Sequence, residues 1–329
     1  MKKYHFLIMI VLGLISCKKN TDSISDPQVD VYVAGSEFNG YAHIAKYWKN
    51  GKAIALTDST QNASANSIVV AGSDVYVAGA EGGVAKYWKN GQVTALTNNG
   101  GISSIAIAGS NIYVAGQEFN GLNGVSVARY WKNGQAVTLS DGTKWAFANS
   151  MVVVGSDVYV AGTDRNEAWI DVAKYWKNGQ AVTLTDGTGW AEGWSIAVVG
   201  SDVYVAGREY NQSVMIAKYW KNGQSIQLTD GSEPALALSI AVVGSNVYVA
   251  GWEGKVATYW KNGQAIALTD GTNYAWAGSI AVTGSDVYVA GYESDGTKNI
   301  AKYWKNGNPV ILGDVSQESE AYSIFLVPR

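Results

Sequence analysis

Short apolar runs alternate with turn residues along most of this chain. In residues 67–98 the runs are Ser67–Ala71, Asp74–Gly79, Val84–Lys89 and Gln92–Thr97. Most of these runs are rich in β-branched or aromatic residues, which is typical of strands. Gly72-Ser73 and Asn90-Gly91 separate two pairs of runs and favour tight hairpin turns. No segment after residue 28 has a helical period, so we expect a four-stranded antiparallel unit.

The unit recurs along the whole chain. The pentapeptide Tyr-Trp-Lys-Asn-Gly occurs seven times, with its Trp at positions 48, 88, 131, 176, 220, 260 and 304. The expected second strand, Tyr-Val-Ala-Gly, starts at 32, 76, 113, 159, 204, 248 and 288. A four-stranded unit with a period of 40 to 45 residues predicts an all-β, seven-bladed β-propeller.

The two ends of the repeats predict how the ring closes. The first unit begins at its second strand, Val29–Tyr32, and the chain leaves through Ser323–Val327, which matches a first strand. We therefore expect the C-terminal strand to pair into the first blade, which would leave no open edge.

The Tyr-Val-Ala-Gly strand followed by a later Trp resembles the kelch repeat of other propellers. The double glycine of kelch is absent, and the Trp here precedes a hairpin turn. The resemblance implies the propeller fold over residues 29–329, and no kelch partner follows from it.

The first 28 residues differ from the repeats. Lys2 and Lys3 precede the apolar run Phe6–Ile15, which is typical of a signal peptide over residues 1–16. The segment Leu14-Ile15-Ser16-Cys17 resembles the lipobox of bacterial lipoproteins. That resemblance implies lipidation of Cys17, a flexible tether over 17–28, and a membrane partner through the lipid. The expected location is the bacterial cell envelope, at the outer membrane or cell surface. An ordinary secretory signal with an incidental cysteine is the alternative.

The composition excludes several classes of function. Removing Lys2 and Lys3 with the signal would leave 22 basic and 27 acidic residues, a net charge of about −5, which argues against nucleic acid. Cys17 is the only cysteine, so no disulfide is possible within one chain. His43 is the only histidine after the signal, which leaves little material for His-based catalysis or metal binding.

The repeated aromatic residues have a structural interpretation. Pairing of the second and third strands places Val77 beside Trp88 on one face of the sheet, and Ala78 beside Tyr87 on the other. Blades pack face to face, so the large groups of one blade are expected to meet the small groups of the next.

A recurrent acidic residue follows each second strand and allows two interpretations. Seven carboxylates in a ring could bind cations. Alternatively, each forms a diagonal ion pair with a base on the third strand, which we favour because such cross-strand pairs are common. The pentapeptide lysines have similar diagonal partners, such as Asp74 for Lys89. The acids are Glu37, Glu81, Glu118, Asp164, Glu209, Glu253 and Glu293, and the bases are Lys46, Lys86, Arg129, Lys174, Lys218 and Lys302, with Thr258 in the remaining place.

Sequence variation between the units falls in two connections. The loop from second to third strand and the loop between blades vary, and both project from one end of the ring, which we call the variable face. Aromatic residues in or beside these loops are the candidate binding residues. They come from the third to seventh blades, and the alternative is that they fill gaps between blades or the central channel. The candidates are Trp145, Trp169, Trp190, Trp194, Tyr210, Trp252, Tyr274, Trp276 and Tyr292.

These features lead to three hypotheses for function. The first is a monomeric, non-catalytic binding module without a cofactor, which captures a glycan or protein through the aromatic loops. The second is an envelope scaffold for other proteins. The third is a glycoside hydrolase that uses two of the loop carboxylates. No Gly-rich phosphate loop and no calcium-binding run of EF-hand type is found in the sequence.

Overall fold

The computed structural model describes residues 29–329 except 122–123 and 212–213. The expected signal peptide (1–16) and the lipidated Cys17 with its tether (17–28) lie outside the described residues.

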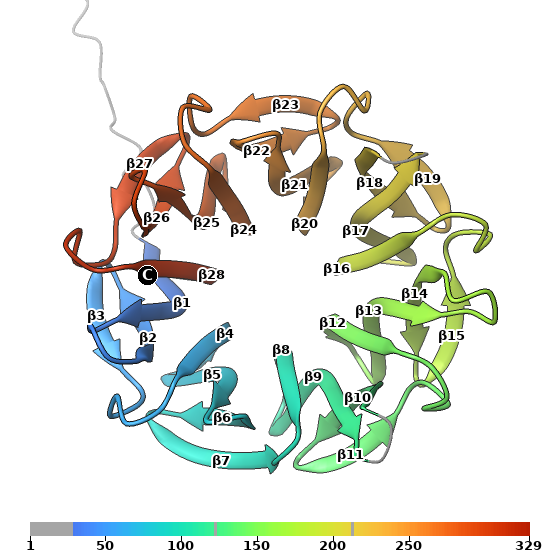
Figure 1. Cartoon of the computed structure of the whole chain (residues 1–329), viewed down its shortest axis with the longest axis horizontal. Coiled ribbons are helices and arrows are strands. Elements are labelled where there is room, and N and C mark those ends of the chain that lie inside the picture. Colours follow the sequence, from blue (N-terminus) through green and yellow to red (C-terminus); the bar gives the residue numbers. More distant parts are fainter. Residues whose placement is uncertain (1–28, 122–123, 212–213) are drawn as a thin grey trace, which may run out of the picture.

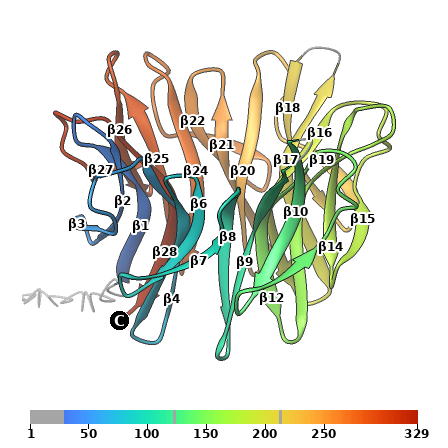
Figure 2. The ribbon, with the colours of Figure 1, turned by 60° about the horizontal axis from the view of Figure 1, so that its bottom comes forward.

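Seven four-stranded antiparallel sheets form a ring in the described part of the chain (Figure 1). Blade 1 contains β28, β1, β2 and β3, and blades 2 to 7 follow in chain order, from β4–β7 to β24–β27. This architecture confirms the predicted seven-bladed propeller. Figure 2 shows the strands running along the height of the ring, with the connections at its two ends.

The strands of each blade run in order from the centre of the ring to its rim. The first, innermost strands are β4 (Ala63–Ala71), β8 (Gly100–Ala108), β12 (Ala146–Val154), β16 (Ala191–Val199), β20 (Ala235–Val243), β24 (Ala275–Thr283) and β28 (Ser319–Pro328). The second strands are β1 (Val29–Phe38), β5 (Asp74–Glu81), β9 (Asn111–Asn120), β13 (Asp157–Arg165), β17 (Asp202–Asn211), β21 (Asn246–Glu253) and β25 (Asp286–Ser294). The third strands are β2 (His43–Lys49), β6 (Val84–Lys89), β10 (Val125–Lys132), β14 (Asp171–Lys177), β18 (Val214–Lys221), β22 (Val256–Lys261) and β26 (Asn299–Lys305). The outermost strands are β3 (Lys52–Ala55), β7 (Gln92–Thr97), β11 (Gln135–Thr138), β15 (Gln180–Thr183), β19 (Gln224–Gln227), β23 (Gln264–Ala267) and β27 (Asn308–Ile311).

The ring closes as the ends of the repeats predict. Strand β28 pairs antiparallel with β1, from Val29 opposite Pro328 to Glu37 opposite Ser319. Beside this seam the Arg329 guanidinium donates to Asp30, and hydrogen bonds from Arg329 and Asn50 lower the pKa of Asp30 to about 2. Closure therefore joins the first and last described strands in one sheet.

The hairpin turns also follow the predicted chemistry. Asn90 and Gly91 both lie in the left-handed region, with φ of 49° and 82°, as a turn of type I′ requires. The third and fourth strands of blade 2 have the predicted bounds. The first strand, β4, begins four residues before the predicted Ser67, and the second strand continues to Glu81. The polar residues at the start of β4 concealed this extension.

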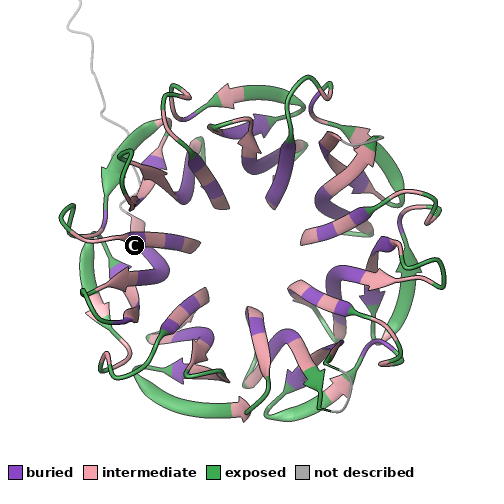
Figure 3. Cartoon of the chain, viewed as in Figure 1, coloured by how far each residue is buried: buried purple, intermediate pink, exposed green. Residues whose placement is uncertain are grey.

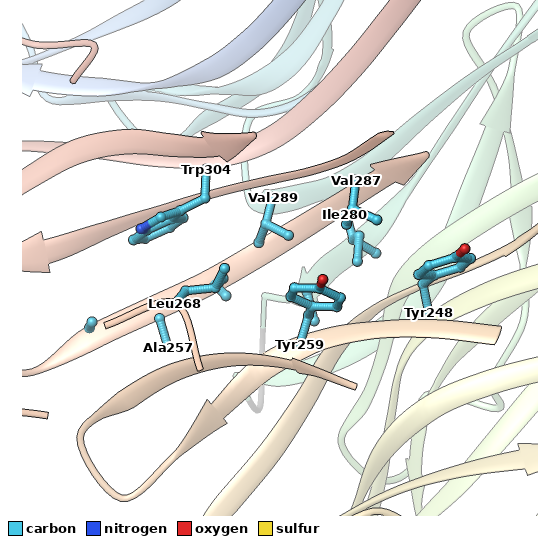
Figure 4. Close-up of a cluster of buried hydrophobic side chains, with 11 residues drawn as sticks. Tyr248, Ala257, Tyr259, Leu268, Ile280, Val287, Val289 and Trp304 are labelled. Carbon is cyan, nitrogen blue, oxygen red and sulfur yellow. The ribbon is translucent and has the colours of Figure 1, made fainter. Parts of the chain in front are cut away.

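The core lies between the blades. At each interface, the face of one blade that carries Tyr and Ala packs against the face of the next blade that carries Trp and Val. Between blades 6 and 7, Tyr248, Ala250 and Tyr259 of one blade pack against Val289 and Trp304 of the next (Figure 4). The same arrangement closes the ring, where Tyr288 and Ala290 meet Val33 and Trp48. The prediction that large groups meet small ones is confirmed. Figure 3 shows this burial on the inner strands and exposure along the outermost ones.

Ion pairs account for the recurrent charges. Six of the seven carboxylates pair with the predicted bases: Lys46–Glu37, Lys86–Glu81 (2.7 Å), Arg129–Glu118 (3.1 Å), Lys174–Asp164 (2.7 Å), Lys218–Glu209 (2.5 Å) and Lys302–Glu293 (2.6 Å). Lys89 likewise binds Asp74 at 2.8 Å. At the seventh place, beside Thr258, burial and the charges of Asp230 and Glu233 raise the pKa of Glu253. The ion-pair interpretation is thus confirmed, and no metal-binding cluster of His, Cys, Asp or Glu occurs among the described residues.

Candidate functional site

A β-bulge interrupts the first strand of every blade and creates a ring of seven residues. In blade 2, Ala65 pairs with Gly79 and Ser67 with Ala78, so Asn66 is left out of the ladder. The equivalent residues of the other blades are left out in the same way. We call this set the bulge ring: Asn66, Ser103, Asn149, Trp194, Leu238, Gly278 and Tyr322.

A repeated serine next to each bulge links neighbouring blades. The backbone N–H of Ile105 donates to Ser67 Oγ of the preceding blade at 3.1 Å. Equivalent bonds of 3.1 to 3.3 Å join every pair of neighbouring blades, and Ile68 to Ser323 completes the circle. The serine is constant because it satisfies a backbone donor beside the bulge, whereas the bulge residue itself differs from blade to blade.

All seven bulge residues line one cavity of about 230 Å³ at the centre of the ring, together with Ile102 and Trp276. The innermost strands surround this centre in Figure 1. In β4 the bulge residue is the fourth of nine residues, so the cavity lies toward the variable face, where the first strands begin.

Two further rings of varying residues adjoin the bulge ring, and the three rings together are called the central site. One ring lies two residues before each bulge: Ser64, Gly101, Phe147, Glu192, Leu236, Trp276 and Glu320. The other is made of their partners on the second strands: Ala80, Gln117, Thr163, Arg208, Trp252, Tyr292 and Ser36. The flanking positions, by contrast, are nearly the same in every blade. Variation within the sheets is therefore concentrated around the centre of the ring.

One side of the central site is aromatic. Trp252, Tyr274, Trp276 and Tyr292 line a cavity of about 310 Å³ between blades 6 and 7. Trp276 stacks on Tyr292 with ring centroids 5.4 Å apart, and its edge meets Tyr322 at 6.1 Å. Burial, followed by the charge of Glu320, raises the pKa of Tyr292 to about 12, so its hydroxyl is neutral at ordinary pH.

The opposite side of the central site is polar. A cavity of about 330 Å³ lies at blades 3, 4 and 5, and its walls include Gln117, Thr163, Glu192 and Arg208. Arg208 pairs with Glu192 at 2.7 Å, and Trp194 Nε1 donates to the same carboxylate at 2.9 Å. Trp194 lines both this cavity and the central one, and Trp276 lines both the central and the aromatic one. The three cavities therefore adjoin, with an aromatic wall on one side and hydrogen-bonding groups on the other.

The structure divides the nine aromatic residues that the sequence singled out. Trp194, Trp252, Trp276 and Tyr292 belong to the central site, and Tyr274 lies at its edge with 66% of its surface exposed. Trp194, Trp252, Trp276 and Tyr292 all lie within strands, whereas Tyr274 lies in the loop before β24.

The other candidates lie outside these three cavities. Arg165 lies 5.6 Å from the ring of Trp145 and 5.2 Å from that of Trp190, and Arg208 lies over Tyr210 at 5.4 Å. Trp169 is 58% exposed and has a positive φ of 62°. Trp145 also meets the ring of Phe147 in a T-shaped contact with centroids 6.4 Å apart, so Trp145 and Tyr210 contact residues of the central site although they do not line its cavities.

Sequence reasoning missed most of the central site. Asn149, Thr163, Leu238 and Tyr322 are not aromatic loop residues, so a search of the loops passed over them. Aligning the first strands on the repeated Ser67 position would have revealed them. The residue before that serine is of six different types in the seven blades and lies between two nearly constant neighbours.

Comparisons with known proteins give the fold and no family. No family model matches the chain, and no curated protein matches it. The kelch resemblance therefore rests on the quoted residues alone. In the described residues, no helix is long and apolar enough to cross a membrane.

Solved structures do match. A structure from a study of two prolyl endopeptidases matches with a TM-score of 0.51 at 12% identity, over 89% of this chain and 50% of that one. Acylaminoacyl peptidase of Pyrococcus horikoshii matches with a TM-score of 0.52 at 12% identity, over 87% of this chain and 51% of that one. This chain thus spans about half the length of these two proteins.

The β-propeller domain of the Trilobed protease from Pyrococcus furiosus also matches, with a TM-score of 0.52 at 12% identity, over 87% of this chain and 94% of that one. That domain has an open velcro topology, whereas β28 closes the ring here.

These matches correct the function expected from the sequence. A glycan-binding or protein-capturing module, an envelope scaffold or a glycosidase was expected from the loop aromatics and carboxylates. The structures found are instead parts of peptidases. The expectation was wrong because aromatic residues and carboxylates in loops are common to many kinds of binding surface and do not by themselves identify a class of ligand.

Proposed function

We propose that this propeller is a non-catalytic peptide-binding domain that works beside a peptidase and receives an extended peptide at its central site. The observation that carries the proposal is the convergence of the varying positions of all seven blades on one cavity. Residues that differ between otherwise constant repeats are the ones available for ligand recognition.

The chemistry of the central site fits a peptide. Its aromatic side, with Trp252, Trp276 and Tyr292, offers large apolar surfaces to a side chain. Its polar side offers hydrogen-bonding groups for amides. An extended peptide carries both kinds of group along one chain. The resemblance to peptidase propellers supports the same class of ligand, as an analogy of fold.

Binding of short peptides to residues 29–329 tests the proposal. We expect fluorescein-labelled ten-residue peptides with one Phe to bind, as measured by fluorescence polarisation, and peptides with Ala in that place to bind more weakly. Trp276→Ala should weaken binding about tenfold or more, because truncating a central aromatic anchor typically costs 2 kcal/mol or more.

Two further variants make this test specific. Trp276→Phe keeps an aromatic ring and should retain most of the affinity. Trp169→Ala removes an exposed loop tryptophan and should leave binding unchanged. Absence of peptide binding, or equal losses in Trp169→Ala and Trp276→Ala, would refute the proposal.

We also propose that Cys17 is lipidated and holds the propeller at the bacterial cell envelope. The support is the sequence Leu14-Ile15-Ser16-Cys17 after an apolar run, which lies outside the described residues. In a bacterial host, the full chain should incorporate radiolabelled palmitate and enter the membrane fraction. Cys17→Ser should abolish the label, and a labelled Cys17→Ser protein would contradict the assignment.

A further inference from the structure

Three residues that line the polar cavity of the central site each carry a buried polar atom without a hydrogen-bond partner in the protein. Thr163 is only 3% exposed, and its Oγ1 atom makes no hydrogen bond. Gln117 Oε1 and Arg208 Nε are likewise buried and unpartnered. All three residues line the same cavity of about 330 Å³. Buried polar atoms are almost always hydrogen-bonded, so three orphans around one cavity point to a bound polar group.

The charges of this cavity are already balanced. The Arg208 guanidinium pairs with Glu192 at 2.7 Å. Asp171 accepts two hydrogen bonds from Arg165, at 2.7 and 3.1 Å. Each carboxylate in the wall thus has its own guanidinium. A charged ligand would enter without a counter-charge, which is costly in a buried place, so the cavity favours a neutral polar group.

The orphan atoms also specify the hydrogen-bonding pattern of that group. Gln117 Oε1 only accepts, Arg208 Nε only donates, and the Thr163 hydroxyl does either. A complementary group must therefore carry a donor and an acceptor together. A carboxamide does so, since its NH₂ can donate to Gln117 and its oxygen can accept from Arg208 and Thr163. Phe147 and Trp194 add aromatic rings to the same wall.

We infer that this cavity is a subsite for the side-chain carboxamide of a glutamine or asparagine. The inference deepens the proposed function, because the carboxamide belongs to the peptide bound at the central site. A carboxylate of the same shape has no donor for Gln117, and a thioether has no donor and is only a weak acceptor for Arg208 and Thr163. The subsite therefore selects Gln over Glu and over Met.

Small amides test the subsite independently of peptide binding. The probes are the N-acetyl methylamides of Gln, Glu and Met. The readout is the NMR signal of the Trp194 indole N–H, which donates to Glu192 in the cavity wall and is assigned by its loss in Trp194→Phe. The Gln probe should shift this signal and bind about tenfold more tightly than the other two, the usual effect of one or two hydrogen bonds.

Variants of Thr163 decide whether the orphan atoms carry the selectivity. Thr163→Val removes the hydroxyl at nearly constant shape and should reduce the preference for Gln to about twofold or less. Thr163→Ser keeps the hydroxyl and should retain the preference. Thr258→Val is the matched control, since Thr258 is equally buried in blade 6 and its hydroxyl already donates to Val256 O at 3.3 Å.

The possible results separate this inference from the proposed function. Equal binding of the three probes would overturn the subsite, and so would an unchanged preference in Thr163→Val. Peptide binding by fluorescence polarisation would still stand in either case. Conversely, a Gln-selective response of Trp194 without any peptide binding would support the subsite and refute the peptide-binding function.

Discussion

Replacing Trp304 with alanine is expected to lower the free energy of unfolding by about 3–5 kcal/mol, as large aromatic truncations in cores do. Trp304 is 1% exposed and lies between blades 6 and 7, against Ala257 and Leu268 (Figure 4). Its indole fills a gap that the small residues of the neighbouring blade leave. Alanine would leave a cavity at the interface between blades 6 and 7, and the ring closes only when every such interface is formed. Urea denaturation followed by circular dichroism measures the loss.

A loop tryptophan provides the control for this prediction. Trp169 is mostly exposed, so Trp169→Ala should change the free energy of unfolding by about 0.5 kcal/mol or less. If Trp304→Ala and Trp169→Ala lose equal stability, the pentapeptide tryptophans do not hold the blades together. Trp48, Trp176 and Trp260, which are buried to the same extent, should then behave like Trp169 as well.

The fold could be predicted because local and global signals agree in each repeat. Asn90-Gly91 fixes the register of the hairpin between the third and fourth strands, with Trp88 opposite Val93. Pairing of the second and third strands places Val77 opposite Trp88 and Ala78 opposite Tyr87, as the sequence predicts. The position of Ser323–Val327 at the end of the chain then predicts the closing strand. Each of these inferences needs only one blade or one pair of neighbouring strands.

The central site could not be predicted in the same way, because it depends on contacts between blades. The bulge at Asn66 follows from no propensity of its own. The adjacent Ile68 N–H is satisfied by Ser323 of the neighbouring blade, which lies 255 residues away in sequence. A single unit treated in isolation shows only a weak strand start with small polar residues. The variable loops were more conspicuous, and they directed the functional hypothesis to aromatic residues rather than to the varying positions of the first strands.

Trp194 shows how a bulge changes the position of a side chain in the fold. The sequence placed Trp194 in or beside a variable-face loop. In the structure it is the bulge residue of β16, and it lines the cavity between the polar and central parts of the site. Trp190 is an exposed residue just before the strand, whereas Trp194, four positions later, lines the central cavity. The bulge causes this difference, because it changes the alternation of side chains between the two faces of the strand.

Replacing Gly207 with alanine is expected to cost about 3 kcal/mol, because a side chain there has no room. A Cβ atom on Gly207 would lie 1.9 Å from the carbonyl oxygen of Glu192 and 3.0 Å from the ring of Trp220. The first of these atoms is backbone, so β16 itself must move to relieve the overlap. The glycine of Tyr-Val-Ala-Gly is therefore required by the close approach of the bulged first strand.

Gly189 is the matched control for this substitution. A Cβ atom on Gly189 would meet only Tyr210 O, at 3.6 Å, which is an ordinary contact. Gly189→Ala should therefore change the free energy of unfolding by about 0.5 kcal/mol or less. Urea denaturation of both variants makes the comparison, and equal stabilities would show that the bulge does not require a glycine.

The Gly207 variant also links the bulge to the central site. Glu192 precedes the bulge residue Trp194 by two positions and accepts its indole N–H at 2.9 Å. Movement of the Glu192 backbone should therefore shift the Trp194 indole N–H signal even where the ring stays folded. Gly251→Ala makes the same overlap with Leu236 O in blade 6, at 1.9 Å. It should cost similar stability and leave the Trp194 signal in place, because the strain is confined to one blade. A Trp194 signal that responds equally to both variants would mean that the bulges move together.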